Sequence, residues 1–200
     1  MPQPAVLLFD LGGVLVDNAI FADLPQLLPT PIADADLRAR WADSPAVHQF
    51  ECGQIAADEF AAAFVAEWRL PIAPAAFLER FAAWPRGLYP GAEALLLGLR
   101  RRYRIAYLSN CNAVHWGGFG GLLQHADDAF SSHLWGVMKP DPAIFAMAVD
   151  ALGGDPSVIC FFDDAPRNVE AARTIGMKAH LTAGFAALEA TLRSLGLGDR

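Results

Sequence analysis

Asp10 lies at a position where burial makes a charged carboxylate unfavourable unless a partner stabilises it. It follows the apolar run 5–9 directly and leads into Gly12 and Gly13. The run is short, rich in strand-forming residues and bounded by a turn signal, so it predicts a buried β-strand. A carboxylate at the end of such a strand is poorly hydrated and needs a cation or a hydrogen-bonding partner. The alternative is an Asp that only caps its own turn.

Other polar residues follow apolar runs or directly precede a helix-like stretch: Ser109, Asn110, Lys139, Asp163 and Asp164. In an open parallel sheet, ligands bind outside the carboxyl ends of the strands. We therefore expect these side chains to converge with Asp10. Each pair alone has an ordinary explanation, because Ser-Asn suits a turn and Asp-Asp suits a helix N-cap. Their occurrence together, each at a strand end, favours a functional site.

The chemistry available to this set is binding of a metal and a phosphate. Asp10, Asp163 and Asp164 would repel one another without a counter-ion, and Mg²⁺ prefers such oxygen ligands. Ser109 offers a hydroxyl, and the following helix offers free N–H groups for phosphate. Lys139 offers a compact positive charge. The chain has 2 lysines and 13 arginines, so a lysine at this position indicates that a point charge is required.

Alternating elements around these residues predict an α/β fold. Further strands are expected at 105–108, 158–162 and 177–181, with a weak one at 130–134. Helices are expected at the following ranges: 92–99, 113–125, 142–152, 166–175 and 185–195. Asp141 and Pro142 suit the start of one helix and Gly153 its end. Alternation of this kind indicates a Rossmann-like, three-layer core with a parallel sheet covered on both faces.

Residues 18–87 have a different pattern, with no clear strand. They are rich in alanine, show helical spacing of apolar residues, and are divided into short segments by prolines. We interpret them as a small helical cap inserted after the first strand. Residues 1–17 and 88–200 would then form the catalytic α/β core.

Composition excludes several classes of function. Of the 200 residues, 54% are hydrophobic, the formal net charge is −7 and the pI is about 5.1, which argues against a nucleic-acid partner. No apolar stretch is long enough to span a membrane. The three cysteines have no metal-binding spacing and fit a reducing compartment, so a cytoplasmic location is expected.

The polar motifs together resemble the haloacid-dehalogenase-like hydrolase superfamily. The matching segments are Phe9-Asp10-Leu11-Gly12-Gly13-Val14-Leu15, Leu108-Ser109-Asn110, Lys139-Pro140, and Phe161-Phe162-Asp163-Asp164 with Asn168 beyond. The stretch 48–55 is similar to the cap of a subgroup that holds bacterial glucose-1-phosphate phosphatases and the phosphatase domain of soluble epoxide hydrolases.

The resemblance implies a Mg²⁺-dependent phosphatase acting on a small phosphorylated metabolite. Asp10 would be the nucleophile that forms an aspartyl-phosphate. Asp10, the Gly12 carbonyl and Asp164 would hold Mg²⁺, with Asp163 as a ligand or a supporting residue. Ser109, Asn110, Lys139 and Gly12 would bind the phosphoryl group, and Ser109 and Lys139 would act in catalysis.

Gly12 departs from the pattern of the family's phosphatases, which usually have an acid two residues after the nucleophile. General acid–base help is worth about 10²–10⁴ in rate. Either another group serves, with His48, His115 and Asp17 as candidates, or the leaving group is a good one, or the enzyme is weak. We favour a good leaving group such as the anomeric hydroxyl of a sugar-1-phosphate.

Other functions remain open at this stage. A metal-independent 2-haloacid dehalogenase also lacks an acid two residues after its nucleophile, but it would not need Asp163 and Asp164. A receiver domain would place its acidic pair first in the chain. The absence of an acid at Gly12 is also consistent with a catalytically weak protein that binds a phosphorylated ligand. Substrate contacts are expected from these cap and core residues: Trp41, His48, Glu51, Trp84, His115 and Trp116.

Overall fold

A five-stranded parallel sheet forms the centre of the computed structural model, which describes residues 4–198. Its order is β5-β4-β1-β6-β7. The strands are β1 (Val6–Phe9), β4 (Arg104–Ser109), β5 (Asp128–Ser131), β6 (Ile159–Asp163) and β7 (Lys178–Leu181). Strand β1 lies between β4 and β6, with Phe9 level with Tyr107 on one side and Phe162 on the other. The three strands that carry the polar motifs are therefore neighbours.

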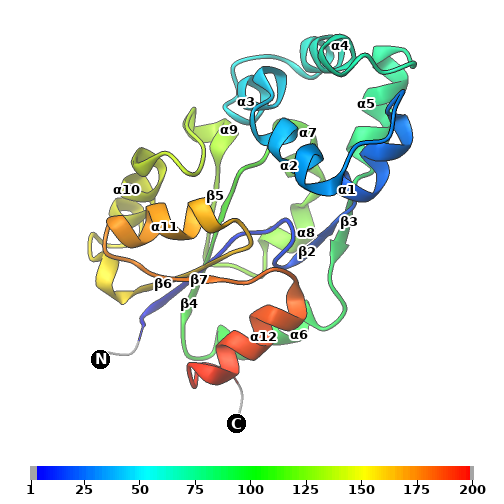
Figure 1. The fold of residues 1–200 in the computed structure, drawn as a ribbon. Helices are drawn as coiled ribbons and strands as arrows, with labels where there is room; N and C mark the ends of the chain where they lie inside the picture. Colours follow the sequence, from blue (N-terminus) through cyan, green and yellow to red (C-terminus); the bar gives the residue numbers. More distant parts are fainter. Residues whose placement is uncertain (1–3, 199–200) are drawn as a thin grey trace.

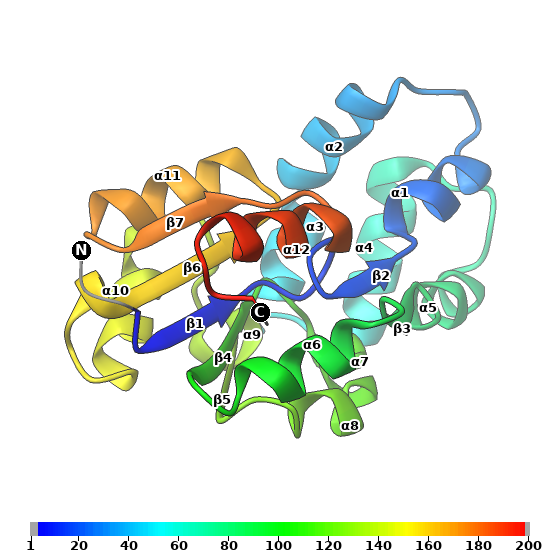
Figure 2. The same ribbon diagram turned by 90° about the horizontal axis from the view of Figure 1, so that it is seen from below.

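Helices cover both faces of this sheet (Figure 2). Leu7 and Phe9 pack on the side of α6 (Ala92–Leu99) and α12 (Phe185–Ser194). Leu8 packs on the side of α10 (Pro142–Ala151) and α11 (Pro166–Thr174). Successive strand residues point to opposite faces, so an unbroken apolar strand serves two cores. The predicted α/β class with a three-layer parallel core is confirmed.

A group of helices lies to one side of the sheet (Figure 1). In the sequence, one short strand precedes this group and another follows it. β2 (Val16–Asn18) and β3 (Pro85–Leu88) pair antiparallel as the stalk of this group. The helices are α1 (Ile20–Asp23), a 3-10 turn (Leu24–Leu27), α2 (Asp34–Ala42), α3 (Pro45–Glu51), α4 (Ala57–Trp68) and α5 (Pro74–Ala82). We call residues 19–84 the insertion. It has its own buried cluster, in which Phe64 and Phe77 stack at 4.8 Å between ring centroids.

The structure differs from the sequence-based expectation at three places. The expected strand-free stretch 18–87 ends in β3, where Pro85 is tolerated because it is the first residue of a strand in a two-stranded ribbon. The expected helix 113–125 is two short helices, α7 (Ala113–Gly118) and α8 (Gly120–Leu123), because paired glycines weaken it. The expected strand 130–134 begins earlier, at Asp128, and gives way to α9 (Ser132–Trp135).

The first residues of β4 and β5 are joined by an ion pair. Arg104, the first residue of β4, donates from Nε and Nη2 to the two carboxylate oxygens of Asp128 at 2.6 and 2.9 Å. This bidentate pair holds the two strand beginnings together.

The structure also describes the three cysteines and the length of the helices. Cys52, Cys111 and Cys160 are all free and buried. Within residues 4–198, none of the helices has the length and apolar character needed to cross a membrane.

Candidate active site

The strand ends bring Asp10, Ser109 and Asp163 to one edge of the sheet, as expected from their order in the sequence. Asp10 follows β1, and its N–H donates to the Phe162 carbonyl at 2.9 Å. Ser109 and Asp163 are the last residues of the neighbouring strands β4 and β6. Lys139 reaches this edge from the loop before α10.

Lys139 lies at the centre of the site and is 2% exposed. Its Nζ is 2.9 Å from Asp10 Oδ1 and 2.7 Å from Asp163 Oδ2, and it donates to the Leu108 carbonyl at 2.9 Å. An ammonium group has three donors, so all of them are used. Burial opposes the charge, but the two carboxylates outweigh that effect and raise the pKa of Lys139. The side chain is therefore a fixed positive charge.

Asn110 holds the backbone of Lys139. The Lys139 N–H donates to Asn110 Oδ1 at 2.8 Å, and Asn110 Nδ2 donates to the Lys139 carbonyl at 2.8 Å. The amide was expected to contact phosphate. Its hydrogen bonds favour a role in positioning Lys139, although Asn110 also lines the cavity described below.

The two carboxylates of the Asp163–Asp164 pair differ in surroundings. Asp163 is fully buried and accepts from Ala165 N–H at 2.8 Å and from Asn168 Nδ2 at 3.0 Å, in addition to Lys139. Asp164 is half-buried and lines the cavity. The pair thus separates into one side chain that holds Lys139 and one that is open to a ligand.

Asp10, Asp163 and Asp164 each offer a carboxylate oxygen, and these atoms lie within 4.8 Å of one another. Burial, partly offset by Lys139, and the repulsion of Asp163 and Asp164 raise the pKa of Asp10 to about 7. Burial and then Asp163 also raise the pKa of Asp164. Clustered carboxylate oxygens are the donors that a hard divalent cation prefers, so this set fits Mg²⁺.

The glycines after Asp10 are not equivalent. Gly13 has φ +74°, and a Cβ there would lie 2.5 Å from Asp164 Oδ2. Gly13 therefore has to be glycine for the chain to pass beneath this carboxylate. Gly12 has no left-handed backbone, and a Cβ there would lie 3.3 Å from Asn18 Nδ2. The backbone at Gly12 does not require a glycine.

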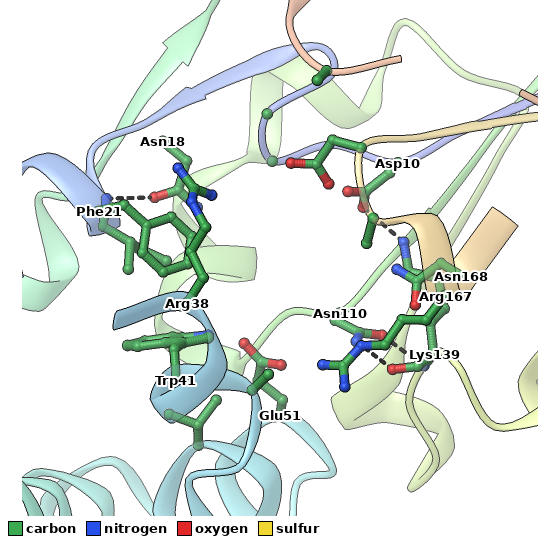
Figure 3. Close-up of a pocket in the computed structure, with 18 of the residues that line it drawn as sticks. Asp10, Asn18, Phe21, Arg38, Trp41, Glu51, Asn110, Lys139, Arg167 and Asn168 are labelled. Atoms are coloured by element: carbon green, nitrogen blue, oxygen red, sulfur yellow. Dashed lines mark hydrogen bonds and ion pairs between the residues drawn. The ribbon is translucent and has the colours of Figure 1, made fainter. Parts of the chain in front are cut away.

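A cavity of about 810 Å³ lies over these residues, between the core and the insertion (Figure 3). Asp10, Asn110, Lys139 and Asp164 line it from the core. The insertion contributes aromatic, charged and polar side chains: Phe21, Arg38, Trp41, His48 and Glu51. We call the core side the floor of the cavity and the insertion side its roof.

Ser109 lines a second, smaller cavity of about 40 Å³. The two cavities share part of their lining, including Gly12, Glu51 and Asn110. Ser109 is 4% exposed and belongs to a narrow extension of the main site. Of the residues expected to contact phosphate, Lys139 lines the main cavity, Ser109 lines the smaller one, and Gly12 and Asn110 line both where the two cavities meet.

Of the three acid candidates, His48 is the one that lines the main cavity. His115 is buried, with Nε2 2.7 Å from the Phe81 carbonyl and Nδ1 3.2 Å from Asn112 Nδ2. Burial lowers the pKa of His115 to about 4, so it is neutral and structural. Asp17 lies in β2, outside the lining of either cavity, with Arg86 at 4.0 Å.

Two tryptophans expected near the substrate lie elsewhere. Trp84 is 2% exposed and belongs to the core of the insertion, where its ring centroid is 5.2 Å from that of Phe81. Trp116 packs beside the core cluster and does not line either cavity. Trp84 was expected as a contact from the cap and Trp116 from its place after Ser109-Asn110, but both rings serve in hydrophobic packing instead.

Sequence reasoning missed several polar residues that line the main cavity, among them Asn18, Arg38 and Arg167. Asn18 ends β2, Arg38 lies on α2 and Arg167 lies in the first turn of α11. Arg167 is one residue before Asn168, so its place beside the last motif was a usable signal. Arg38 had none, because its contact with the site depends on how the insertion packs.

Comparison with known proteins finds a phosphatase and an epoxide hydrolase among the relatives. D-ribitol-5-phosphate phosphatase of Bacteroides thetaiotaomicron is 27% identical over 186 residues, covering 86% of this chain and 88% of that protein. Bifunctional epoxide hydrolase 2 of Rattus norvegicus is 38% identical over 56 residues, which are 28% of this chain and 10% of that protein.

A solved structure of similar fold is a HAD family enzyme of Bacteroides thetaiotaomicron in complex with magnesium and inorganic phosphate. It has a TM-score of 0.72 and 22% sequence identity, and the match covers 91% of this chain and 96% of that one. The family model of haloacid dehalogenase-like hydrolases matches residues 4–176. The chain therefore belongs to the haloacid dehalogenase-like hydrolase family.

Proposed function

We propose that this chain is a Mg²⁺-dependent phosphatase that acts on a small phosphorylated metabolite through an aspartyl-phosphate at Asp10. The observation that carries the proposal is the Asp10–Lys139 pair, 2.9 Å apart, within a carboxylate cluster that opens into a cavity. A carboxylate held this way has the position and charge environment of a nucleophile for phosphoryl transfer. The phosphatase relative of similar length supports the same reaction class.

The geometry supports a separate role for each floor residue. Asp10 would attack phosphorus, while Lys139 and Ser109 would stabilise the charge of the transferring group. Asp10, Asp164 and the Gly12 carbonyl would hold Mg²⁺, which neutralises phosphoryl charge when bound. Asp163 would act through Lys139, because its oxygens are already occupied by Lys139, Ala165 and Asn168.

The roof supports a polar, ring-shaped or polyol leaving group. Trp41 and Phe21 line it with aromatic rings, with the Arg38 guanidinium over the Phe21 ring at 4.1 Å. His48 and Arg38 offer polar contacts, and Asn18 of β2 lines the same cavity. Sugar-1-phosphates are our preferred substrates because their leaving oxygen is more acidic than that of an ordinary alcohol. Phosphate release from sugar-1-phosphates and sugar-6-phosphates tests this preference, and equal or reversed rates would contradict it.

A 2-haloacid dehalogenase is the second candidate. A dehalogenase structure shares the fold with a TM-score of 0.68 at 21% identity. The half-buried Asp164 in the cavity argues against that activity, since a metal-independent displacement has no use for a third carboxylate beside the nucleophile. Chloride release from 2-chloropropionate would favour the dehalogenase.

Hydrolysis of p-nitrophenyl phosphate, with and without Mg²⁺, tests the phosphatase directly. We expect turnover that depends on Mg²⁺ and is lost in Asp10→Asn, which keeps the shape of the side chain but not its charge. Identical low activity in the wild type and Asp10→Asn would favour a phospho-ligand-binding protein.

A further inference from the structure

The proposed phosphatase reaction needs a proton for the leaving group, and Gly12 has no side chain to supply it. Glu51 lies across the cavity from Asp10. It is the last residue of α3, and Figure 3 shows its side chain pointing from the roof into the open space. It is 9% exposed, and its carboxyl group forms no hydrogen bond or ion pair with any residue in 4–198.

Such a carboxyl group is unfavourable for folding. Burial of a carboxyl group without a hydrogen-bonding partner costs free energy. The C-terminal end of a helix also disfavours negative charge. Burial, and then repulsion by Asp10, raise the pKa of Glu51 to about 7, so the protonated acid is well populated near neutral pH. Costs of this kind are typical of functional sites.

The position of Glu51 is also specific. Both cavities have Glu51 in their lining, and the smaller one has Ser109 and Gly12 as well. Glu51 therefore borders both cavities, together with Gly12 and Asn110, two of the expected phosphoryl contacts. In phosphoryl transfer the attacking and leaving oxygens lie roughly in line. Attack by Asp10 from the floor would direct the leaving oxygen toward the roof.

We propose that Glu51 is the general acid and base of this enzyme, a role that rests on the proposed phosphatase function. In the first step the Asp10 carboxylate forms a bond to phosphorus and the bond from phosphorus to the leaving oxygen breaks. That oxygen keeps the electron pair and takes the proton of Glu51. In the second step a water attacks phosphorus and gives one proton to the Glu51 carboxylate. The bond from phosphorus to the Asp10 oxygen breaks, so the Asp10 carboxylate and inorganic phosphate are released.

His48 is the competing group. It lies one helical turn before Glu51 on the same face of α3 and also lines the main cavity. His48 is exposed and does not line the smaller cavity, which Ser109, Gly12 and Asn110 line. This difference favours Glu51.

A series of aryl phosphates tests the proposal, with leaving phenols that range from 2,4-dinitrophenol to phenol. The proteins are the wild type, Glu51→Gln, His48→Gln, and Glu79→Gln as a matched change at an exposed glutamate of α5. For Glu51→Gln we expect kcat/KM to fall about 10²-fold or more with phenyl phosphate. It should change little with 2,4-dinitrophenyl phosphate, whose leaving group needs no proton. A burst of dinitrophenol should appear, because hydrolysis of the aspartyl-phosphate loses its base.

His48→Gln and Glu79→Gln should keep the wild-type dependence on the leaving group. In one further variant, Glu51→Ala, added formate should partly restore the activity with phenyl phosphate. An equal loss with every phenol in Glu51→Gln would overturn the proposal in favour of a structural or binding role. A leaving-group effect confined to His48→Gln would assign the proton to His48. Thermal unfolding of Glu51→Gln separates misfolding from lost chemistry. Absence of Mg²⁺-dependent turnover in the wild type with every aryl phosphate would instead refute the phosphatase itself.

Discussion

Ionisable groups on the floor of the cavity are held by one another, whereas two on α3 of the roof are not, although Arg38 elsewhere on the roof pairs with Asp34 at 2.8 Å. On the floor, Lys139, Asp163 and Asn110 are tied together by hydrogen bonds of 2.7 to 2.8 Å. On the roof, Glu51 and His48 have no such partner among residues 4–198. Glu51 is 9% exposed, so for this residue exposure to solvent alone does not explain the difference.

This difference indicates a division of labour. Charges that are fixed before the substrate arrives stabilise a transition state at no further cost of reorganisation. The phosphoryl group is common to all substrates of a phosphatase, so a rigid floor suits it. The leaving group varies, and polar side chains without protein partners are available to contact it or to exchange protons with it.

The largest expected effect comes from breaking the floor at Lys139. Lys139→Met keeps much of the side chain's volume but leaves Asp10 and Asp163 buried without their cation. Loss of one partner from a buried ion pair costs about 3–5 kcal/mol, so we expect a destabilisation of that size. Urea unfolding measures it, with Arg101→Met as an exposed control. Equal stability of the two variants would contradict a pre-formed floor.

A second prediction concerns His115, which joins the two regions by its 2.7 Å contact with the carbonyl of Phe81 in the insertion. The folded-state pKa of about 4 lies below the ordinary pKa of 6.5 for a histidine, so the unfolded chain binds more protons between these values. The stabilisation is complete above pH 6.5 and is lost as the pH falls through 4. The loss should be about 3 kcal/mol.

Urea unfolding at several pH values from 7.5 to 4 checks this prediction, with His115→Gln as the reference. Glutamine can donate to the same carbonyl but does not titrate. The stability difference between the two proteins should shrink as the pH falls, and parallel curves would show that His115 is not buried in its neutral form.

The sequence predicted the floor well because strand ends in a parallel sheet converge by topology. The order of Asp10, Ser109 and Asp163 along the chain was sufficient to place them at one edge. Separation of Asp163 from Asp164 was not possible, because it depends on which side chain Lys139 reaches. The roof was poorly predicted for the same kind of reason. Arg38 lines the cavity and Trp84 does not, because of how the short helices of the insertion pack against one another.

Glycines indicated an unusual backbone in two places, a weakened helix at 113–125 and a turn after Asp10. Gly117, Gly118 and Gly120 lie in a region expected to be one helix, and the structure divides it there. Gly13 was noted for sharp turning, and its φ of +74° agrees. Glycine thus indicates that the backbone is unusual, while the direction of the change depends on neighbours that the sequence does not show.

The two glycines after Asp10 provide a smaller and more local test of the floor. Gly13→Ala forces a Cβ to within 2.5 Å of Asp164 Oδ2 in a left-handed backbone, so we expect a loss of about 1–3 kcal/mol. Displacement of Asp164 should also weaken Mg²⁺ binding about 10-fold. Gly12→Ala meets Asn18 Nδ2 at 3.3 Å and should leave Mg²⁺ binding nearly unchanged.

Titration calorimetry with Mg²⁺ compares the two variants, and thermal unfolding measures their stability. Similar Mg²⁺ affinity in both would mean that Asp164 is not a ligand. Weaker binding in Gly12→Ala than in Gly13→Ala would place the metal nearer to Asn18 than the carboxylate cluster indicates.

The smallest expected effect has the opposite sign and comes from the roof. Because the folded-state pKa of Glu51, about 7, lies above the ordinary pKa of 4.5 for a glutamate, its contribution to stability is present below pH 4.5 and is lost as the pH rises through 7. Glu51→Gln should therefore become more stable than the wild type by about 1 kcal/mol above pH 7, since water in the cavity limits the effect. Urea unfolding at pH 5 and pH 8 measures the change. A destabilised Glu51→Gln at pH 8 would mean that Glu51 has an unseen partner and belongs with the floor residues. A stabilised one would show that the protein keeps an unfavourable carboxyl group at the point where the proposed reaction needs a proton.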